Sequence, residues 1–288
     1  MKVTDKVRES GGVPVFICDF SPPRGAGPEG IAPAKGLEAD YICVAYNPGK
    51  AVRVDSAAMA SAIKRAVGRE VVFNLATRDM NKLALQSHLL GAQMLDLENL
   101  VVLAGDAFSE RDRSQATAVA DFRPTELIAS IAAMNAGTDY KGSRLRYPTD
   151  FCIGASIDLT RGVAREARLA HRKAQAGAHF FLTQPIFNPT EIGEFQQAYA
   201  AITGTEMARP IFWGVHILEK DGVIFSSVPP EVRRELEAGR PGTDIALALL
   251  RQVFDAGMCT IYLIPPILRG GARQYEAAQA VLAEARRI

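Results

Sequence analysis

Eight short apolar runs, spaced regularly along the chain, are the feature that most constrains how this sequence can fold. The runs are rich in Val, Ile, Leu and Phe and cover residues 13–20, 41–46, 70–76, 99–106, 151–157, 178–184, 211–217 and 258–263. Such runs are typical of strands buried on both faces, as in a parallel sheet that helices cover. Stretches with helical apolar spacing separate the runs, which gives about one strand for every 36 residues of the 288. One of these helices is expected to begin at Thr77, and a final helix is expected from about Gly271 to Arg286.

This alternation predicts an α/β fold, a single (β/α)8 TIM barrel that spans residues 1–288. A doubly wound sheet rarely needs eight such units, and the first strand is not followed by a Gly-x-Gly-x-x-Gly loop. With 48% hydrophobic residues the chain can bury a large core, so one domain is expected.

Charge and cysteine content exclude several classes of function. The chain has 33 Lys and Arg against 32 Asp and Glu, a net charge of +1, so no global field attracts nucleic acid or an anionic membrane. The charged N-terminus lacks a signal-like apolar core and no run approaches the roughly 18 residues of a spanning helix, so we expect a cytoplasmic protein. The isolated cysteines carry no CxxC pair and are expected to be buried in strands: Cys18, Cys43, Cys152 and Cys259.

The run at 99–106 ends in Gly105 and Asp106. In a (β/α)8 barrel the carboxyl ends of the strands form the face that carries the chemistry, and Gly105 would let the backbone approach a ligand closely. Asp106 is therefore a candidate site residue, although a loop aspartate that caps the following turn would give the same pattern. The long polar segment 108–123 that follows is typical of a functional loop.

Polar residues end most of the other predicted strands as well. Taken singly, each is best explained as a turn cap, but together they predict a mixed acid and amide site on one face. Clusters at metal-ligand spacing and a Gly-x-Ser-x-Gly elbow are both missing from the sequence, which argues against a metal site and against serine chemistry. The candidates are Asp19, Tyr46, Asn74, Thr77, Asp106, Ser156, Asp158, Thr183, Gln184, His216 and Tyr262.

Five motifs, in order along nearly the whole chain, carry a family resemblance: DFSPPR at 19–24, NLATRD at 74–79, QSHLLGA at 86–92, LAGD at 103–106, and AGA at 176–178 running to TQPIF at 183–187. Together they resemble the methylenetetrahydrofolate reductases. The resemblance implies FAD on the C-terminal face of the barrel and reversible reduction of 5,10-methylenetetrahydrofolate to 5-methyltetrahydrofolate. It also implies NAD(P)H as electron donor and a homo-oligomer.

The resemblance assigns three catalytic residues. Asp19 matches the family's acid, which protonates a folate nitrogen, but that acid is a glutamate and aspartate is one methylene shorter. Asp106 matches an aspartate beside flavin and pterin, whose charge makes the reduced flavin a better hydride donor. Gln184 matches a glutamine under the substrate, whose amide can both donate to and accept from a pterin edge.

The same resemblance assigns the flavin contacts. They are Tyr46, Asn74, Ala104, Gly105 and Asp106 at strand ends, and Glu166, Arg172 and Lys173 on the helix that precedes the run at 178–184. A solvated charged face would also explain that helix. Asn74 stands where the family commonly has histidine. The last strand also lacks the family's Asn-Arg ending, and Arg269 is a nearby arginine that could replace the missing one.

Two other functions remain compatible with the sequence. NAD(P)H could deliver hydride directly to the folate without flavin. Alternatively, the chain could be a non-catalytic barrel, a subunit of a folate or one-carbon complex.

Overall fold

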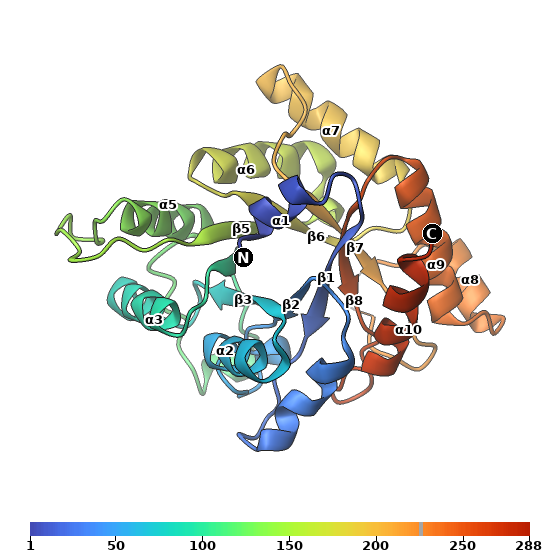
Figure 1. The fold of residues 1–288 in the computed structure, drawn as a ribbon, viewed down its shortest axis with the longest axis horizontal. Coiled ribbons are helices and arrows are strands. Elements are labelled where there is room, and N and C mark those ends of the chain that lie inside the picture. The colour runs from blue at the N-terminus through green and yellow to red at the C-terminus, as the bar shows by residue number, and fades with distance from the viewer. Residues whose placement is uncertain (225–226) are drawn as a thin grey trace.

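The computed structural model describes residues 1–224 and 227–288 and consists of eight parallel strands closed into a barrel inside a ring of helices (Figure 1). The strands pair in sequence order and β8 closes on β1. The predicted (β/α)8 barrel is confirmed. The strands are β1 Val15–Phe20, β2 Tyr41–Val44, β3 Glu70–Ala76, β4 Asn99–Leu103, β5 Cys152–Ile157, β6 Phe180–Pro185, β7 Ile211–His216 and β8 Thr260–Ile264.

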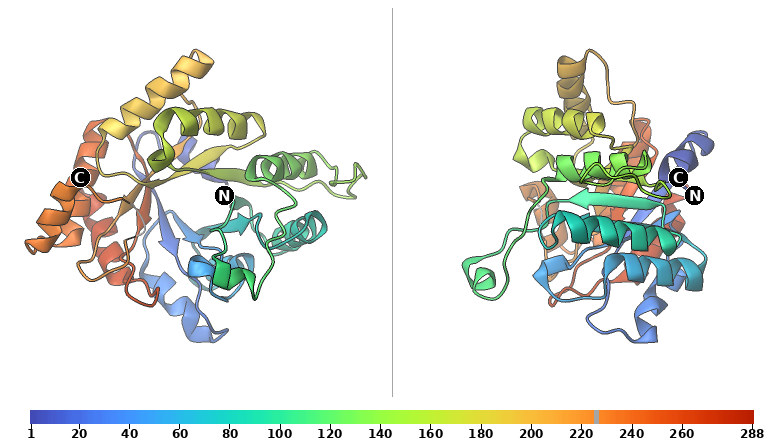
Figure 2. Two further views of the ribbon diagram at one scale, coloured as in Figure 1. Left: turned by 180° about the vertical axis from the view of Figure 1, so that it is seen from behind. Right: turned by 90° about the vertical axis from the view of Figure 1, so that its left-hand side faces the viewer.

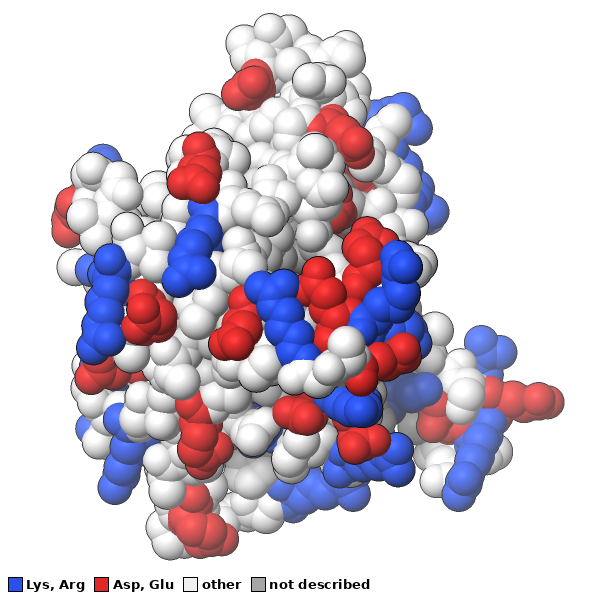
Figure 3. Space-filling model, turned by 90° about the vertical axis from the view of Figure 1, so that its right-hand side faces the viewer, with Lys and Arg blue, Asp and Glu red and all other residues white. Residues whose placement is uncertain are grey.

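Helices surround the strands, and most of them form the outer layer. They are α1 Val3–Glu9, α2 Ser56–Val67, α3 Lys82–Met94, α4 Glu110–Arg113, α5 Pro124–Asn135, α6 Val163–Gln175, α7 Thr190–Thr203, α8 Pro230–Glu237, α9 Gly242–Asp255 and α10 Tyr275–Ala285. Three 3-10 segments are η1 Pro28–Gly36, η2 Pro48–Lys50 and η3 Leu159–Arg161. Charges of both signs are interspersed over the side shown in Figure 3, in keeping with the net charge of +1.

The core has two layers because successive residues of a strand point to opposite faces. One layer lies between the strands and the helices and includes Phe16, Phe73 and Trp213. The other fills the barrel interior with Val15, Ile17, Tyr41, Cys43, Val72, Val101, Cys152, Phe180, Leu182 and Phe212. Asp19 follows Ile17 by two residues, so it continues this inward-facing row at the carboxyl end of β1.

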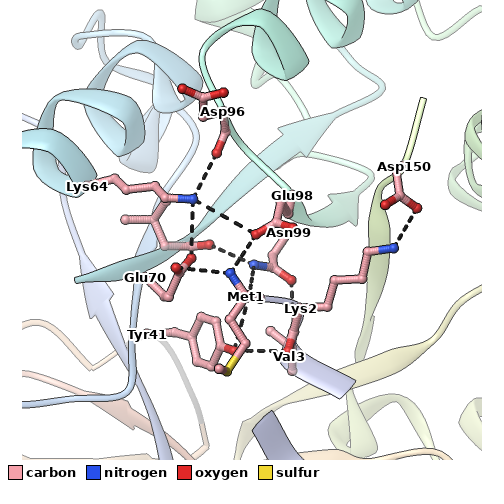
Figure 4. A network of polar contacts seen from close by, with 11 residues as sticks. Met1, Lys2, Val3, Tyr41, Lys64, Glu70, Asp96, Glu98, Asn99 and Asp150 are labelled. Carbon is pink, nitrogen blue, oxygen red and sulfur yellow. Dashed lines mark hydrogen bonds and ion pairs between the residues drawn. The ribbon is translucent and has the colours of Figure 1, made fainter. Parts of the chain in front are cut away.

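The N-terminal end of the barrel is covered by α1 and the residues before it (Figure 4). The Val3 amide donates to Asn99 Oδ1 at 2.9 Å, and Tyr41 donates to the Lys2 carbonyl at 3.1 Å. The Met1 ammonium pairs with Glu70 and Glu98. These contacts fill the base of the barrel, which leaves the opposite end as its open face.

The loops at the opposite end include the segment 104–123, which projects away from the end that carries both termini (Figure 2). It is longer than the other strand-to-helix connections near the site and contains the short α4. Lys50 pairs with Asp112 at 2.7 Å, and Arg78 lies over the Phe108 ring at 4.4 Å, so these side chains help to hold the loop to the barrel.

Three local expectations were wrong. The helix expected from Thr77 begins at Lys82, because the Thr77 amide still donates to Leu103 of the neighbouring strand. The last helix begins at Tyr275 rather than Gly271, because Gly270 and Gly271 have φ of +89° and +84° and form a tight turn. Cys259 lies just before β8 and is half-buried, whereas the other three cysteines are buried as expected.

Candidate functional site

A pocket of about 650 Å³ opens at the carboxyl ends of β4, β5 and β6. Its walls come from these strand ends, from the start of α5 and from one face of α6. Nine residues expected at the site line it: Ala104, Gly105, Asp106, Ser156, Asp158, Glu166, Arg172, Lys173 and Gln184. The structure therefore brings together the strand-end and helix groups that the motifs suggested.

A second pocket of about 740 Å³ adjoins the first over the centre of the barrel mouth. The two pockets share Asp106, Asp158, Arg161 and Gln184. The remaining wall of the second pocket comes from loops after β1, β2, β7 and β8. Asp106 and Gln184 thus stand where two ligands, one in each pocket, would meet.

The backbone at Asp106 is fixed by Arg78, which lies under the turn. Arg78 is buried, pairs with Asp79 at 2.6 Å and donates from Nη1 to the Asp106 carbonyl at 2.8 Å. Gly105 has φ of +81°, and a Cβ there would lie 3.1 Å from Arg78 Cβ. Glycine is needed at this turn, and the Asp106 side chain is left exposed to the pocket. Arg78 belongs to the NLATRD motif, but the sequence gives no sign that it fixes the backbone at Asp106.

The face of α6 that lines the pocket is packed against the barrel and is not a solvated charged surface. Glu166 and Lys173 are 3% and 5% exposed, seven residues or two helical turns apart. Glu166 accepts from the Asp158 amide at 3.2 Å, and the Lys173 ammonium donates to the Ser156 carbonyl. Burial lowers the pKa of Lys173 to about 8, although the nearby Glu166 carboxylate opposes this shift. Two charged side chains on α6 are thus held against the end of β5.

Asp19, which matches the family's acid, is buried in an ion pair with Arg273. Arg273 Nε donates to its Oδ2 at 3.1 Å and the Tyr262 hydroxyl donates to its Oδ1 at 2.9 Å. Both oxygens act as acceptors, and Asp19 lines neither of the two pockets, whereas its partner Arg273 lines the second. This geometry suits a residue that positions Arg273 better than one that donates a proton.

Two expected flavin contacts lie outside both pockets. Asn74 is 8% exposed inside the barrel and accepts from Cys43 Sγ at 3.4 Å. Tyr46 lies next to Asp79, and burial together with that carboxylate raises the pKa of Tyr46 to about 12. Neither side chain lines the cavity that Lys173 and Gln184 share.

Two other polar residues at strand ends, Thr183 and His216, are buried within the barrel. Thr183 Oγ1 accepts from the Gly214 amide at 2.7 Å, where the pairing of β6 with β7 shifts register. His216 is 4% exposed, and burial, with a smaller contribution from Arg273, lowers its pKa to about 4. These side chains are therefore less available to a ligand than Asp106 or Gln184.

Sequence analysis missed two further cations of the first pocket, Arg123 and Arg161. Arg161 pairs with Asp158 at 2.8 Å. Both arginines lie next to helix starts, at the beginning of α5 and just before α6, and that position was the only available signal. Within residues 1–224 and 227–288, no group of three His, Cys, Asp or Glu could hold a metal ion. No helix in the same residues is long and apolar enough to cross a bilayer.

Comparison with solved structures agrees with this architecture. An uncharacterized protein from Clostridium thermocellum, described as binding two copies of 5-methyl-5,6,7,8-tetrahydrofolic acid, superposes with a TM-score of 0.70 at 12% identity, with 98% of each chain covered. A phosphonopyruvate hydrolase complex with oxalate and Mg²⁺ superposes with a TM-score of 0.52 at 16% identity, covering 100% of this chain and 86% of the other. At these identities the likeness shows the fold alone.

Comparison of the sequence itself identifies a family. No curated protein sequence matches the chain. The family model for methylenetetrahydrofolate reductase matches residues 5–220, from α1 to the end of β7 and just beyond. This match covers three quarters of the chain and includes every motif of the resemblance. The chain therefore belongs to the methylenetetrahydrofolate reductase family.

Proposed function

We propose that the chain reduces 5,10-methylenetetrahydrofolate to 5-methyltetrahydrofolate, with FAD as hydride carrier and NAD(P)H as electron donor. The observation that carries this proposal is the pair of adjoining pockets that share Asp106 and Gln184. A hydride transfer needs two ligands side by side with their reacting atoms in contact. Family membership and the folate named for the Clostridium thermocellum protein both support folate as one of them.

The residues of the 650 Å³ pocket fit a flavin dinucleotide. Lys173, Arg172, Arg161 and Arg123 supply cationic donors suited to a pyrophosphate. Gly105, which cannot carry a side chain at this turn, offers bare backbone for a close approach. A bound flavin would supply the hydride.

The chain's own groups then act on the folate at the junction of the pockets. The Gln184 amide can donate to and accept from the pterin edge, which would orient the ring. The exposed Asp106 carboxylate places a negative charge beside the site of transfer. Asp19 holds Arg273 at the mouth, and the proton for the folate nitrogen is taken from solvent there.

The absorption spectrum of the purified chain, reconstituted with FAD and then given NAD(P)H and methylenetetrahydrofolate, tests the proposal. We expect flavin bands, their loss on addition of NAD(P)H, and formation of methyltetrahydrofolate. Turnover without any bound flavin would instead support direct hydride transfer from NAD(P)H, an outcome that the positions of Tyr46 and Asn74 make worth testing. Folate binding without turnover by any donor would identify a non-catalytic subunit.

Asp106→Asn tests the shared carboxylate. We expect unchanged folding and folate binding, but reduction slowed by at least about tenfold, which corresponds to 1.4 kcal/mol of transition-state stabilisation. Asp221→Asn is the control, because Asp221 is an exposed aspartate that lines neither pocket. Equal rates for wild type and Asp106→Asn would remove Asp106 from the mechanism.

A further inference from the structure

The outer face of α3 is apolar. Its exposed residues are Leu83, Ser87, Leu90 and Met94, and the three large side chains are 62%, 39% and 87% exposed. Lys82 is the only Lys, Arg, Asp or Glu in residues 82–94, all of which the structure describes. In α6, a helix of the same length in the same ring, five such residues occur. An outer helix normally turns charged or polar residues to water, so the surface of α3 is that of a helix with a partner.

The exposed residues of α3 follow one another at intervals of four, three and four. This spacing forms a straight seam along one side of a helix, the pattern by which two helices pack together in a coiled coil. Gly91 lies beside the seam, and outside its own helix no described atom lies within 4 Å of a Cβ placed there. Glycine inside a helix lowers its stability relative to alanine, and the barrel does not require it here. The missing side chain leaves room for the backbone of a second helix.

The hairpin 137–149, between α5 and β5, continues the apolar face beyond the end of α3. Its Tyr147 is 72% exposed, and Gln93 of α3 donates to the Pro148 carbonyl at 3.5 Å. Four of the twelve large apolar side chains that are exposed in the described chain thus lie on α3 or on this hairpin. Both lie on the left of Figure 1, whereas the opposite side, shown in Figure 3, carries many charges. A contiguous exposed apolar patch of this kind marks an interaction surface.

The neighbouring helix α5 widens this face. Gln86 of α3 donates to Ser130 of α5 at 2.9 Å, and Ala129 and Ala136 are exposed on α5. At 1.5 Å per residue α3 is about 20 Å long, and two adjacent helices are about 20 Å wide, so their flat area is about 400 Å². A stable complex buries about 800 Å² on each partner. Side-chain relief and the hairpin add to the flat area, which brings the face into the range of a stable dimer.

The two ends of this face differ in charge. The hairpin end carries exposed cations that form no ion pair with any residue that the structure describes: Lys141, Arg144 and Arg146. The opposite end, at the start of α3 and α5, carries charges of both signs: Lys82, Asp121, Arg123 and Glu126. If two copies met with their α3 helices parallel, the two hairpins would lie together and their like charges would repel. An antiparallel arrangement instead brings each hairpin to the end that carries Asp121 and Glu126.

We propose that α3, α5 and the hairpin 137–149 form a two-fold interface between two copies of this chain, with the two α3 helices antiparallel across the axis. In a two-fold interface the same surface serves both copies, so it must be complementary to itself. The seam meets this requirement, because antiparallel pairing places Leu83 of one copy against Met94 of the second, and Ser87 against Leu90. The interface is independent of the proposed function, because no residue of the seam lines either pocket.

Sedimentation equilibrium of the full chain tests the interface. We expect wild type to be a dimer in the micromolar range. Leu90→Glu places an unpaired charge in the interface twice, once from each copy, and should weaken the dimer by at least about hundredfold. Ile202→Glu is the matched control, because Ile202 on α7 is 40% exposed and Leu90 is 39% exposed. Its dissociation constant is expected to stay within about twofold of wild type.

A pair of substitutions tests the antiparallel arrangement. Leu83→Glu and Met94→Lys should each weaken the dimer by about tenfold or more, and the double variant should recover at least about tenfold, because the new charges then pair between copies. Within one chain the two positions are about 16 Å apart along the helix, so recovery cannot come from a contact inside one copy. Thermal unfolding checks the fold of each variant, which changes at residues 62% and 87% exposed should leave intact.

A monomeric wild type overturns the proposal, and so does a dimer that Leu90→Glu leaves intact or that Ile202→Glu weakens equally. A double variant that binds no tighter than its weaker parent overturns the antiparallel arrangement. If the pure chain stays monomeric but another protein covers the α3 seam, this face has a different partner, and the second copy is refuted as its occupant.

Discussion

Asp19→Asn is the substitution that best separates a positioning role from a catalytic one. In the ion pair the side chains of Asp19 and Arg273 are 6% and 9% exposed, and the Oδ2–Nε distance is 3.1 Å. Asparagine keeps an acceptor for the Tyr262 hydroxyl but leaves the buried guanidinium without its counter-charge. Removing one partner of a buried pair costs about 3–5 kcal/mol. Arg273 borders a pocket that admits water, so we expect the lower end, about 3 kcal/mol.

Urea unfolding of wild type, Asp19→Asn, Arg273→Met and the double variant measures this value. The double variant removes both charges, so we expect it to lose about 2 kcal/mol less than the sum of the two single variants. A cost below about 1 kcal/mol for Asp19→Asn, or strict additivity, would refute the account of the pair. Folate reduction by the same proteins completes the test. If Asp19 only positions Arg273, both single variants slow the reaction alike, whereas an acid at position 19 would be revealed by a loss confined to Asp19→Asn.

Three further substitutions test other parts of the structure. Lys173→Met removes a buried cation of the 650 Å³ pocket and should lower the flavin content of the reconstituted protein by about tenfold, read from its absorbance; full occupancy would contradict the assignment. The pKa of His216 is about 4 in the fold against an ordinary 6.5, so the unfolded chain binds more protons than the fold between these pH values. The free energy of unfolding therefore rises by about 3 kcal/mol as the pH increases from 4 to 6.5. His216→Phe should flatten that rise in urea titrations, and an unchanged slope would exclude His216 as its source. Gly154→Ala places a Cβ 2.5 Å from the Phe180 ring inside the barrel, so we expect about 1–3 kcal/mol of destabilisation, measured as a lower Tm; an unchanged Tm would show that the core yields.

The barrel could be predicted because its signal is local. An apolar run such as 99–103 identifies a buried strand by itself, and eight runs separated by helices leave few alternative folds. Features that depend on contacts between distant residues were not visible. No pattern near Thr77 shows that its amide is already used by β4, which delays α3 to Lys82.

The candidate site also combines features with a local sequence signal and features that depend on contacts between distant residues. Motif order placed Asp106, Lys173 and Gln184 on one face, and the structure brings their side chains to one pocket. The partner of Asp19 was not predictable, because Arg273 lies 254 residues away in a loop outside the matched motifs.

The seam between β1 and β8 has a consequence for how the chain reaches its native state. The first strand is complete at Phe20, yet its second neighbour begins only at Thr260. Near the mouth the seam is held by the Asp19–Arg273 pair, the bond from the Ser21 amide to the Tyr275 hydroxyl, and the stacked rings of Phe20 and Tyr275. Contacts between such distant residues form late in folding, because the loop-closure entropy must be overcome before they stabilise anything. We therefore expect the amide hydrogens of β8 to exchange before those of β4.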